Sequence, residues 1–379
     1  MKKLIIYSLV FFVIVGILLT GCGKKTEERN IKIGVILPLT GQLSTFGQSV
    51  RKGVELALEE VNREGGVLGK KVELIIEDDE SKTDTAQTVV TKLLTKDRVP
   101  LIIGEVISSI TLAVAPLCQR YKVPLITPSA TNADVTRTGD YIFRTCFIDD
   151  FQGSALARFA IESLKAKRAG ILKDVKSDYS IGLASAFAKT FKEMGGEVVN
   201  EQAYAAGDTD FRTQLTSIKA SNPDIIFIPG YYNEVGLIIR QARELSIKAN
   251  LLGGDGWDSP RVLEIAGASA EGTYYGTHFS PLEKSPQVQE FVSVFKQKYN
   301  EEPDALAALG YDTLKLVCSA IKRAGTTEGQ KVRDELAQTK NFAGVTGEIT
   351  IDENRNARKP LVILKIEKGK PTYFISIKP

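Results

Sequence analysis

The sequence predicts an α/β protein made of two doubly wound parallel-sheet lobes, and three observations support this fold class. The chain has 379 residues, a length that favours two domains over a single core. From Ile31 onward, short runs of β-branched residues alternate with longer amphipathic stretches, and the same alternation resumes after Asp149. Predicted strands that are apolar on both faces and separated by helices require a parallel sheet covered on both sides, with right-handed crossovers.

The first half of the chain contains predicted strands with helices between them. The helix over 47–63 places Val50, Val54 and Val61 near one face, and Thr83 with Asp84 marks the start of the next helix. The strands are predicted at 31–37, 72–77, 99–104 and 123–127, and a further helix at 108–121.

The second half repeats this order and then changes character. Its strands are predicted at 169–172, 197–199, 224–228 and 250–252, and its helices at 180–194, 210–220 and 233–245. Longer helices follow at 287–299 and 305–324, with a shorter one near 330–339. The apolar runs 347–351, 360–366 and 373–377 predict a terminal hairpin.

Composition and motifs exclude several classes of function. The formal net charge of +3 is too small to support nucleic-acid binding. The single histidine, His278, excludes sites that need two, and the four cysteines contain no CxxC pair, so zinc chemistry is not expected. No glycine-rich phosphate loop follows a predicted strand, and no nucleophile has a recognisable basic partner. The sequence therefore predicts no catalytic residues, no cofactor and no metal, and His278 is expected to be a structural or surface residue.

The N-terminus has the pattern of an export signal. Two lysines precede an uncharged apolar run over 4–23 that ends in small residues. The tetrapeptide Leu19-Thr20-Gly21-Cys22 resembles the bacterial lipoprotein box, which implies cleavage before Cys22 and acylation of its sulfur. Residues 1–21 are therefore predicted to be a lipoprotein signal peptide and 22–29 a linker, so that the chain would lie outside the cytoplasm, anchored to the membrane. An uncleaved membrane anchor is the alternative.

The remaining cysteines form an odd set, so at most one disulfide can join them. They are Cys118, Cys146 and Cys318, and each lies in an apolar stretch of a predicted helix or strand. This placement predicts buried free thiols.

Candidate binding residues lie in loops that follow predicted strands, because ligands of open parallel sheets bind outside the carboxyl ends of the strands. Ser108 or Ser109 can cap a helix whose first turn can hold an anion, although a plain N-cap explains them equally well. The turn around Thr131 offers a carbonyl, an amide and a hydroxyl, and it also suits an ordinary structural loop. Tyr231 and Asp255 each follow a strand of the second half, where they provide an aromatic wall and a carboxylate.

Short motifs occur in a fixed order along almost the whole chain after the N-terminal segment. They are Gly34-Val-Ile-Leu-Pro-Leu-Thr-Gly41, Phe46-Gly47, Gly53, Asn62-Arg-Glu-Gly-Gly66, Ile102-Ile-Gly104, Ser108-Ser109, Ile126-Thr-Pro-Ser-Ala-Thr131, Phe143-Arg-Thr145, Gly230-Tyr231 and Ile239-Arg-Gln-Ala242. In this order they resemble the branched-chain amino-acid binding-protein family, the type I solute-binding proteins of ABC importers. The resemblance covers about 31–377.

The resemblance implies the type I periplasmic-binding-protein fold, in which three crossover strands join two lobes and the ligand cleft lies between them. The crossings would fall near Asp149, Thr277 and Gly344. Lobe one is then predicted over 30–149 plus 277–343, and lobe two over 150–276 plus 344–379.

The resemblance also implies ligand contacts. The Ser108 hydroxyl and the Thr131 amide match positions that hold a ligand α-carboxylate. The Ser129 carbonyl, the Thr131 hydroxyl and the Asp255 carboxylate match the ammonium cage, although the family usually has Glu at the last position. Tyr231 matches an aromatic residue that flanks the ligand backbone. The other positions assigned to the site are Phe46, Ile107, Ala130 and Tyr179, with Tyr311 a weaker candidate.

The implied function is capture of an apolar or branched-chain amino acid by lobe closure and its delivery to an ABC transporter permease. The expected partners are this small molecule, the permease, and the membrane through the lipid anchor, but not nucleic acid. Asp in place of Glu at position 255 keeps open an amide, urea, a nucleoside or an aromatic acid as the ligand. An extracellular α/β enzyme and a purely structural surface lipoprotein are alternatives from other classes.

Overall fold

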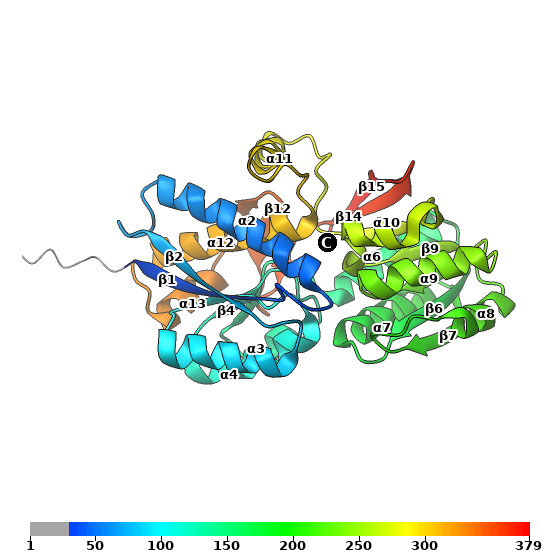
Figure 1. Cartoon of the computed structure of the whole chain (residues 1–379), viewed down its shortest axis with the longest axis horizontal. Helices are drawn as coiled ribbons and strands as arrows, with labels where there is room; N and C mark the ends of the chain where they lie inside the picture. The colour runs from blue at the N-terminus through cyan, green and yellow to red at the C-terminus, as the bar shows by residue number, and fades with distance from the viewer. Residues whose placement is uncertain (1–29) are drawn as a thin grey trace, which may run out of the picture. The chain divides into compact units, whose positions relative to one another are not determined.

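The structure, a computed structural model, describes residues 30–379, so the predicted signal peptide, the linker and Cys22 lie outside the described residues. Residues 31–379 form one compact unit that contains two large sheets and a smaller one. In Figure 1 the strands of the first sheet are blue to cyan and those of the second are mainly green, and helices lie on both sides of each. The α/β class and the two predominantly parallel sheets predicted from the sequence are confirmed.

Lobe one is built around a five-stranded parallel sheet in the order β2-β1-β3-β4-β5. Its strands are β1 (Ile31–Leu37), β2 (Val72–Asp78), β3 (Ile102–Ile103), β4 (Leu125–Thr127) and β5 (Ile142–Arg144). The residues of β3, β4 and β5 are all buried, as a sheet covered on both faces requires. The chain passes from β1 to β2 on one side of β1 and then crosses to β3 on the other side, so the carboxyl ends of β1 and β3 form the switch point at which such sheets bind ligands.

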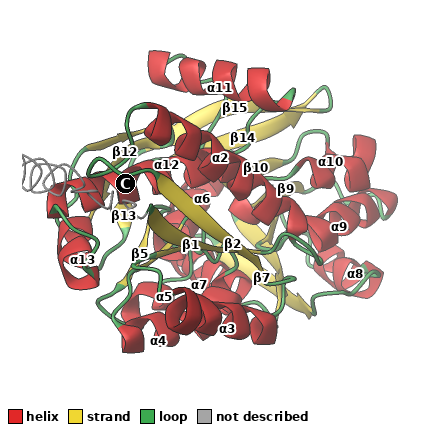
Figure 2. Ribbon diagram, turned by 60° about the vertical axis from the view of Figure 1, so that its left-hand side comes forward, coloured by secondary structure: helices red, strands yellow, loops and turns green. Residues whose placement is uncertain are grey.

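Helices cover both faces of this sheet, as Figures 1 and 2 show. On one face, α2 (Ser44–Arg63) packs along α12 (Ala305–Ala324), and on the other, α3 (Thr83–Lys92) packs against α4 (Ser108–Tyr121). The further helical segments of this part are η1 (Leu93–Asp97), α5 (Asp134–Arg137), α11 (Pro286–Tyr299) and α13 (Gly329–Ala337). The lobe therefore includes three helices from far along the chain, α11, α12 and α13.

Lobe two is built around a seven-stranded sheet in the order β15-β14-β10-β9-β8-β6-β7. The strands are β6 (Arg168–Asp174), β7 (Glu197–Tyr204), β8 (Ile225–Ile228), β9 (Asn250–Gly253), β10 (Tyr274–Thr277), β14 (Leu361–Glu367) and β15 (Lys370–Ile377). The first five are parallel, and β14 and β15 form the predicted antiparallel hairpin.

The helical segments of lobe two include four that the sequence analysis did not predict, α6, η2, α10 and η3. The segments are α6 (Asp149–Glu162), α7 (Asp178–Glu193), α8 (Arg212–Ala220), α9 (Tyr232–Glu244), η2 (Asp255–Trp257), α10 (Pro260–Ala266) and η3 (Gly267–Ala270). The longest unpredicted helix is α6, which packs against α7 and is buried over most of its length. Its apolar residues are therefore not confined to one stripe, so the usual amphipathic signal is weak.

The small third sheet belongs with lobe one, although the sequence analysis assigned its residues from 344 onward to lobe two. It contains β11 (Phe342–Gly344), β12 (Gly347–Ile351) and β13 (Ala357–Arg358). The amides of Val345 and Thr346 donate to Asp312 of α12 at 2.8 and 2.9 Å, and Arg355 donates to the Thr136 carbonyl at 2.9 Å. These hydrogen bonds join the small sheet to lobe one, whereas the predicted boundary near Gly344 assigned it to lobe two. The reason is that an alternating apolar pattern identifies a strand but not the sheet that the strand joins.

The three cysteines in the described range are buried and free, in agreement with the prediction. Burial raises the pKa of each thiol, of Cys118, Cys146 and Cys318, to about 12. These side chains therefore act as small apolar packing residues.

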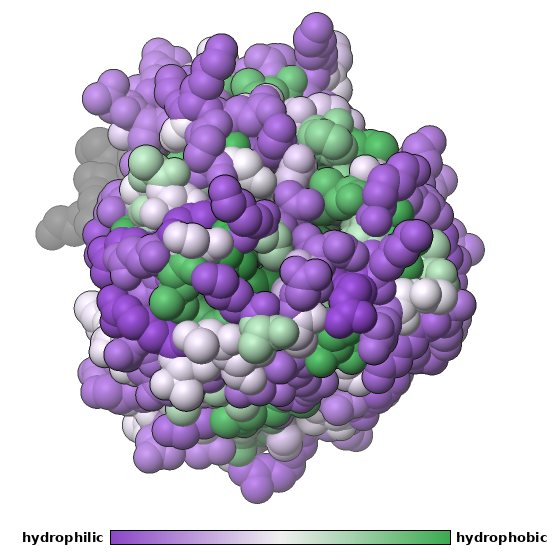
Figure 3. Space-filling view, turned by 90° about the vertical axis from the view of Figure 1, so that its right-hand side faces the viewer, coloured by the Kyte–Doolittle hydropathy of each residue, from purple (hydrophilic) through white to green (hydrophobic). Residues whose placement is uncertain are grey.

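Hydrophilic side chains cover most of the face seen in Figure 3, with apolar residues scattered between them. Within 30–379, no helix combines the length and the apolar character that crossing a membrane requires.

Two glycines allow α2 and α12 to approach closely. A Cβ atom on Gly53 would lie 1.8 Å from the carbonyl oxygen of Ala307, and one on Gly310 would lie 2.4 Å from that of Val50. Such distances leave no room for a side chain, so any larger residue must push the helices apart.

We expect Gly53→Ala to destabilise the fold by on the order of 1–3 kcal/mol, because the added methyl group overpacks this crossing. Thermal unfolding followed by circular dichroism measures the effect. Arg51→Ala, at an exposed position of the same helix, is the control and should change stability by less than about 0.5 kcal/mol. An unchanged midpoint for Gly53→Ala would contradict the close approach.

Candidate functional site

The predicted binding residues of lobe one meet at the start of α4 and in the loop after β4. Ser108, the first residue of α4, is buried, and its Oγ accepts the backbone N–H of Asn132 at 3.2 Å. The Ser129 hydroxyl donates to the Val106 carbonyl at 3.2 Å. The two loops are therefore tied together at a helix N-terminus, whose amides and dipole favour an anion.

Arg144, a fully buried residue of β5, fixes the shape of the loop after β4. Its guanidinium donates to the carbonyls of Ala130 and Asn132 at 2.6 and 2.8 Å. The Ala130 N–H in turn donates to Thr127 Oγ1 at 2.9 Å. Ala130 thus lies in the predicted loop but has its amide and carbonyl engaged within lobe one. The sequence analysis included Arg144 in a motif without assigning it this supporting role.

Thr131 and Asp149 contribute buried polar atoms that have no hydrogen-bond partner among the described residues. These atoms are the Thr131 hydroxyl oxygen and both carboxylate oxygens of Asp149. Burial, and then the negative charge of Asp255, raise the pKa of the Asp149 carboxyl well above its usual range. Unpaired buried carboxylates are costly, so such a group usually marks a place where something else binds. The sequence analysis noted Asp149 only as a lobe crossing.

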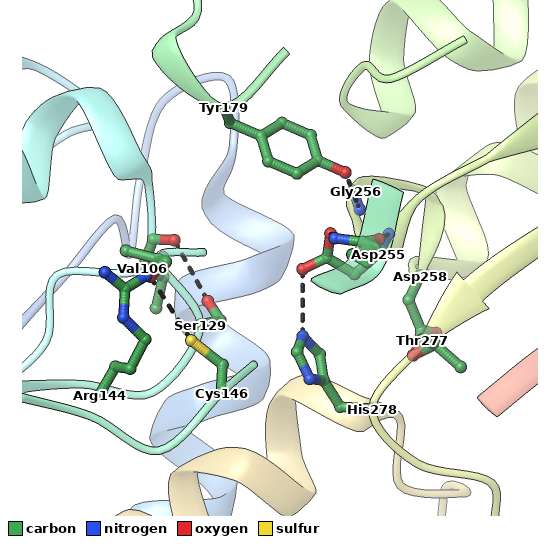
Figure 4. A network of polar contacts seen from close by, with 12 residues as sticks. Val106, Ser129, Arg144, Cys146, Tyr179, Asp255, Gly256, Asp258, Thr277 and His278 are labelled. Carbon is green, nitrogen blue, oxygen red and sulfur yellow. Dashed lines mark hydrogen bonds and ion pairs between the residues drawn. The ribbon is translucent and has the colours of Figure 1, made fainter. Parts of the chain in front are cut away.

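Asp255 is held on both sides by neighbouring side chains. Its Oδ1 accepts from Gln152 Nε2 at 2.9 Å, and its Oδ2 lies 3.1 Å from His278 Nε2, the contact drawn as a dashed line in Figure 4. The Asp255 N–H donates to Gln152 Oε1 at 2.8 Å. The carboxylate is therefore fixed in orientation before any ligand arrives.

His278 is a residue whose importance the sequence analysis missed. It is buried, stacks on Phe147 with ring centroids 3.7 Å apart, and contacts the predicted ligand-binding carboxylate of Asp255. Burial lowers the pKa of His278, and the nearby Asp255 partly opposes this effect. No local pattern links the two residues, because they follow different strands of the second sheet.

Aromatic side chains from both lobes form one wall of the site. The rings of Tyr179 and Tyr231 stack with centroids 5.0 Å apart, and Phe46 of α2 meets Tyr231 edge-on at 5.9 Å. The Tyr179 hydroxyl accepts the Gly256 N–H at 3.0 Å, as seen in Figure 4. The structure therefore brings together three aromatic residues that the sequence analysis assigned to the site.

Hydrogen bonds between the lobes surround this wall. The Tyr232 hydroxyl and the Asn233 amide donate to the Gln42 carbonyl at 2.9 and 2.7 Å. On the α4 side, the Asp178 N–H donates to Ser109 Oγ at 3.1 Å, and the Asn132 amide donates to the Asp178 carbonyl at 2.8 Å. The lobes are thus in contact around the site, which explains why its polar residues are buried.

Of the last two predicted site residues, the structure places Ile107 at the site and Tyr311 away from it. Ile107 is buried beside the α4 N-terminus, and its N–H donates to Glu105 Oε2 at 2.6 Å. Tyr311 lies elsewhere, because its hydroxyl donates to Glu60 Oε2 at 2.6 Å near the far end of α2. Glu60 is roughly 20 Å along the helix from Phe46, so the Tyr311 interpretation is wrong.

Comparison with known proteins agrees with this geometry. The sequence model for periplasmic binding proteins matches residues 30–371, and the chain therefore belongs to that family. The leucine-binding protein LivK from Thermotoga maritima is 42% identical, with a TM-score of 0.88 over 92% of this chain and 99% of that one. LivJ from Streptococcus pneumoniae, a branched-chain amino acid transporter substrate-binding protein in complex with isoleucine, is 37% identical, with a TM-score of 0.87 over 93% of this chain and 100% of that one.

A third solved structure carries a different ligand. It is the solute-binding protein of an ABC transporter from Rhodopseudomonas palustris BisB5, in complex with 3,4-dihydroxybenzoic acid. It is 26% identical, with a TM-score of 0.84 over 92% of this chain and 97% of that one. These comparisons confirm the family resemblance and the type I fold that the motifs predicted, and the relatives are substrate-binding transport proteins.

The environment of His278 generates a prediction about acid stability. The unfolded chain protonates this imidazole near pH 6.5, whereas the folded protein resists protonation because its pKa is lowered by burial. The stabilising contribution is therefore present above pH 6.5 and is lost progressively as the pH falls from 6.5 through the lowered pKa of the folded protein.

We expect wild-type protein to lose stability between pH 7 and pH 5 relative to His278→Gln, by about 1.4 kcal/mol for each unit that separates the folded and unfolded pKa values. Gln keeps an N–H that can donate to Asp255, so it is the matched variant. Thermal unfolding at several pH values gives the difference between the two proteins. Parallel profiles would contradict a buried neutral imidazole.

Proposed function

We propose that this protein is the solute-binding component of an ABC importer and captures an apolar or branched-chain amino acid between its lobes. The observation that carries the proposal is a buried site where Asp149 and the Thr131 hydroxyl lack partners beside Asp255. Two carboxylates in one buried place repel each other, and a bound cation stabilises both in their ionised form. The adjoining N-terminus of α4, with Ser108, suits an anion. An amino-acid zwitterion carries both charges close together.

Each residue has a distinct role in this proposal. The Ser108 hydroxyl and the Thr131 amide bind the α-carboxylate. The Ser129 carbonyl, the Thr131 hydroxyl and the Asp255 carboxylate bind the α-ammonium, and Asp149 supplies further negative charge behind them. Phe46, Ile107, Tyr179 and Tyr231 contact the ligand through apolar surface. The similarity to proteins described as a leucine-binding protein and as an isoleucine complex supports an apolar side chain.

Binding and lobe closure form one process in this proposal. The contacts of Gln42 with Tyr232 and Asn233, and of Ser109 with Asp178, require the lobes to meet. A ligand held by groups of both lobes stabilises the closed state through its differential affinity. The transporter permease then distinguishes loaded from empty protein by the surface that exists only after closure. No covalent bond is made or broken.

The family is extracytoplasmic, and we propose that Cys22 carries the lipid anchor. The proposal rests on the sequence pattern that ends in Leu19-Thr20-Gly21-Cys22. Radiolabelled palmitate should appear in the wild-type protein expressed in a bacterium and not in Cys22→Ser, which should also leave the membrane fraction after processing. Label retained by the variant would contradict acylation at Cys22.

An aromatic acid is the second candidate ligand, because a structure of similar fold binds 3,4-dihydroxybenzoic acid. Such a molecule offers a carboxylate to the start of α4 but brings no ammonium. Asp149 and Asp255 would then remain uncompensated in a buried site, at a cost of several kcal/mol by general estimates. The acidic side of the site therefore favours the amino acid.

We expect leucine, isoleucine or valine to raise the unfolding midpoint of residues 23–379, because a ligand at 1,000 times its dissociation constant adds about 4 kcal/mol. The panel includes leucinamide, urea, nucleosides and 3,4-dihydroxybenzoate. Leucinamide keeps the ammonium but lacks the carboxylate, so it tests the α4 half of the site. A midpoint raised only by the aromatic acid or by urea would overturn the zwitterion proposal.

We expect Asp255→Ala to weaken binding of the responding amino acid by about 2–4 kcal/mol, because one partner of a buried charge pair is removed. Asp255→Asn is the matched variant, since it keeps the shape and loses the charge. Isothermal titration calorimetry measures both. Phe46→Leu should instead change the ranking of side chains. Unchanged affinity in both Asp255 variants would remove this residue from the site.

A further inference from the structure

Glu105 lies directly behind the predicted carboxylate-binding loop and is fully buried. It follows β3 and precedes Ser108 by three positions. Its Oε2 accepts the Ile107 N–H at 2.6 Å, and its backbone carbonyl accepts the hydroxyl of Thr127 at 2.5 Å. Glu105 therefore links the turn that starts α4 to the end of β4.

Asp79 meets Glu105 from the neighbouring loop after β2. It is also fully buried, and its Oδ1 accepts the Ser81 N–H at 2.8 Å. The remaining oxygens, Asp79 Oδ2 and Glu105 Oε1, are buried and have no hydrogen-bond partner among the described residues. The two carboxyls are close enough for the charge of Asp79 to raise the pKa of Glu105. Two ionised carboxylates cannot hydrogen bond to each other, so a proton held by one of them is what would satisfy both unpartnered oxygens.

The titratable groups around Asp79 and Glu105 do not compensate the negative charge of the pair in place of that proton. Asp78, at the end of β2, adds a third negative charge next to Asp79, and its own carboxylate already accepts the Leu39 and Thr40 amides at 2.9 and 3.1 Å. Across the site, Tyr231 is close enough to feel the charge of Glu105, but its buried phenol is neutral. Asp78 therefore disfavours a second negative charge on the pair, and the neutral Tyr231 does not offset it.

We propose that Asp79 and Glu105 share one proton and act as a positioning pair for the Ile107–Ser108 turn, so that ligand affinity falls when the shared proton is lost. This inference rests on the proposed function for its ligand. The two side chains act through the turn, and neither is assigned a contact with the ligand.

The direction of the pH effect follows from burial. Burial, and then the negative charge of Asp78, raise the pKa of Asp79 to about 6, and burial, and then the charge of Asp79, raise that of Glu105 well above its usual value. The folded protein thus holds a proton that the unfolded chain releases at lower pH. The stability that this proton provides is fully present below the pKa of a carboxyl in the unfolded chain, about 4, and is lost progressively as the pH rises through the upper pKa of the pair.

The test uses Glu105→Gln and Asp79→Asn, because each amide replaces the shared proton with a permanent N–H donor. Titration with L-isoleucine between pH 6.0 and 8.5 gives the dissociation constants, and the unfolding midpoints are measured without ligand over the same range. Glu64→Gln, at an exposed position of the same lobe, is the control. Each variant alone tests the shared proton, so a result from either one is sufficient if the other does not fold.

We expect the wild-type dissociation constant to rise toward the alkaline end, by at most about tenfold per pH unit, and the wild-type midpoint to fall with it. Glu64→Gln should follow wild type, whereas Glu105→Gln and Asp79→Asn should bind with nearly constant affinity and keep their midpoints. Equal pH slopes in wild type and both amide variants would overturn the shared proton. If no amino acid binds at any pH, the proposed function fails, and the ligand-free midpoints still decide whether the proton is shared.

Discussion

The burial of charged side chains is the physical constraint on which the region between the two sheets depends. Both carboxylate oxygens of Asp312 are satisfied, because they accept the amides of Val345 and Thr346 and the Thr346 hydroxyl. Burial lowers the pKa of the nearby Lys359 to about 8, and the charge of Asp312 opposes this effect. The carboxylate of Asp149, by contrast, has no hydrogen-bond partner among the described residues, although the charge of Arg144 partly opposes the rise in its pKa. We propose that the ligand ammonium is the missing partner of this acid.

The topology explains why the site lies where it does. α4 starts after β3, α9 starts after β8, and the segment with Asp255 starts after β9, so their N-termini lie at the carboxyl ends of the two sheets. In a parallel sheet all strands run in the same direction, so the helices that follow them all begin at the same edge of the sheet. Helix N-termini supply amide donors without added side chains, whereas a cation must be met by carboxylates. The site therefore combines backbone donors on one side with side-chain acceptors on the other.

Local patterns determined how much of this could be predicted. β1, α4 and α12 begin and end where the sequence analysis placed them, because β-branched runs and helix caps mark them locally. Ser108, Thr131 and Asp255 follow strands, and the family resemblance singled them out. The contacts of Asp149, Arg144 and His278 join residues that no motif connects, and so their roles required the fold. The same reason explains the segment 345–358, whose partner sheet is set by nonlocal hydrogen bonds.

The contacts of Asp255 with its neighbours give a physical reason for the shorter acid at this position. A Glu side chain could extend further, but Asp255 has both carboxylate oxygens in contact with Gln152 and His278. Hydrogen bonds from two fixed residues remove the freedom that a flexible acid would lose on binding. They also reduce the negative charge that Asp255 presents to a ligand ammonium. The carboxylate of Asp149, which has no hydrogen-bond partner among the described residues, supplies the remaining negative charge in this proposal. In the proposed complex the ammonium is thus balanced by a preorganised acid and an uncompensated one, and affinity depends on both.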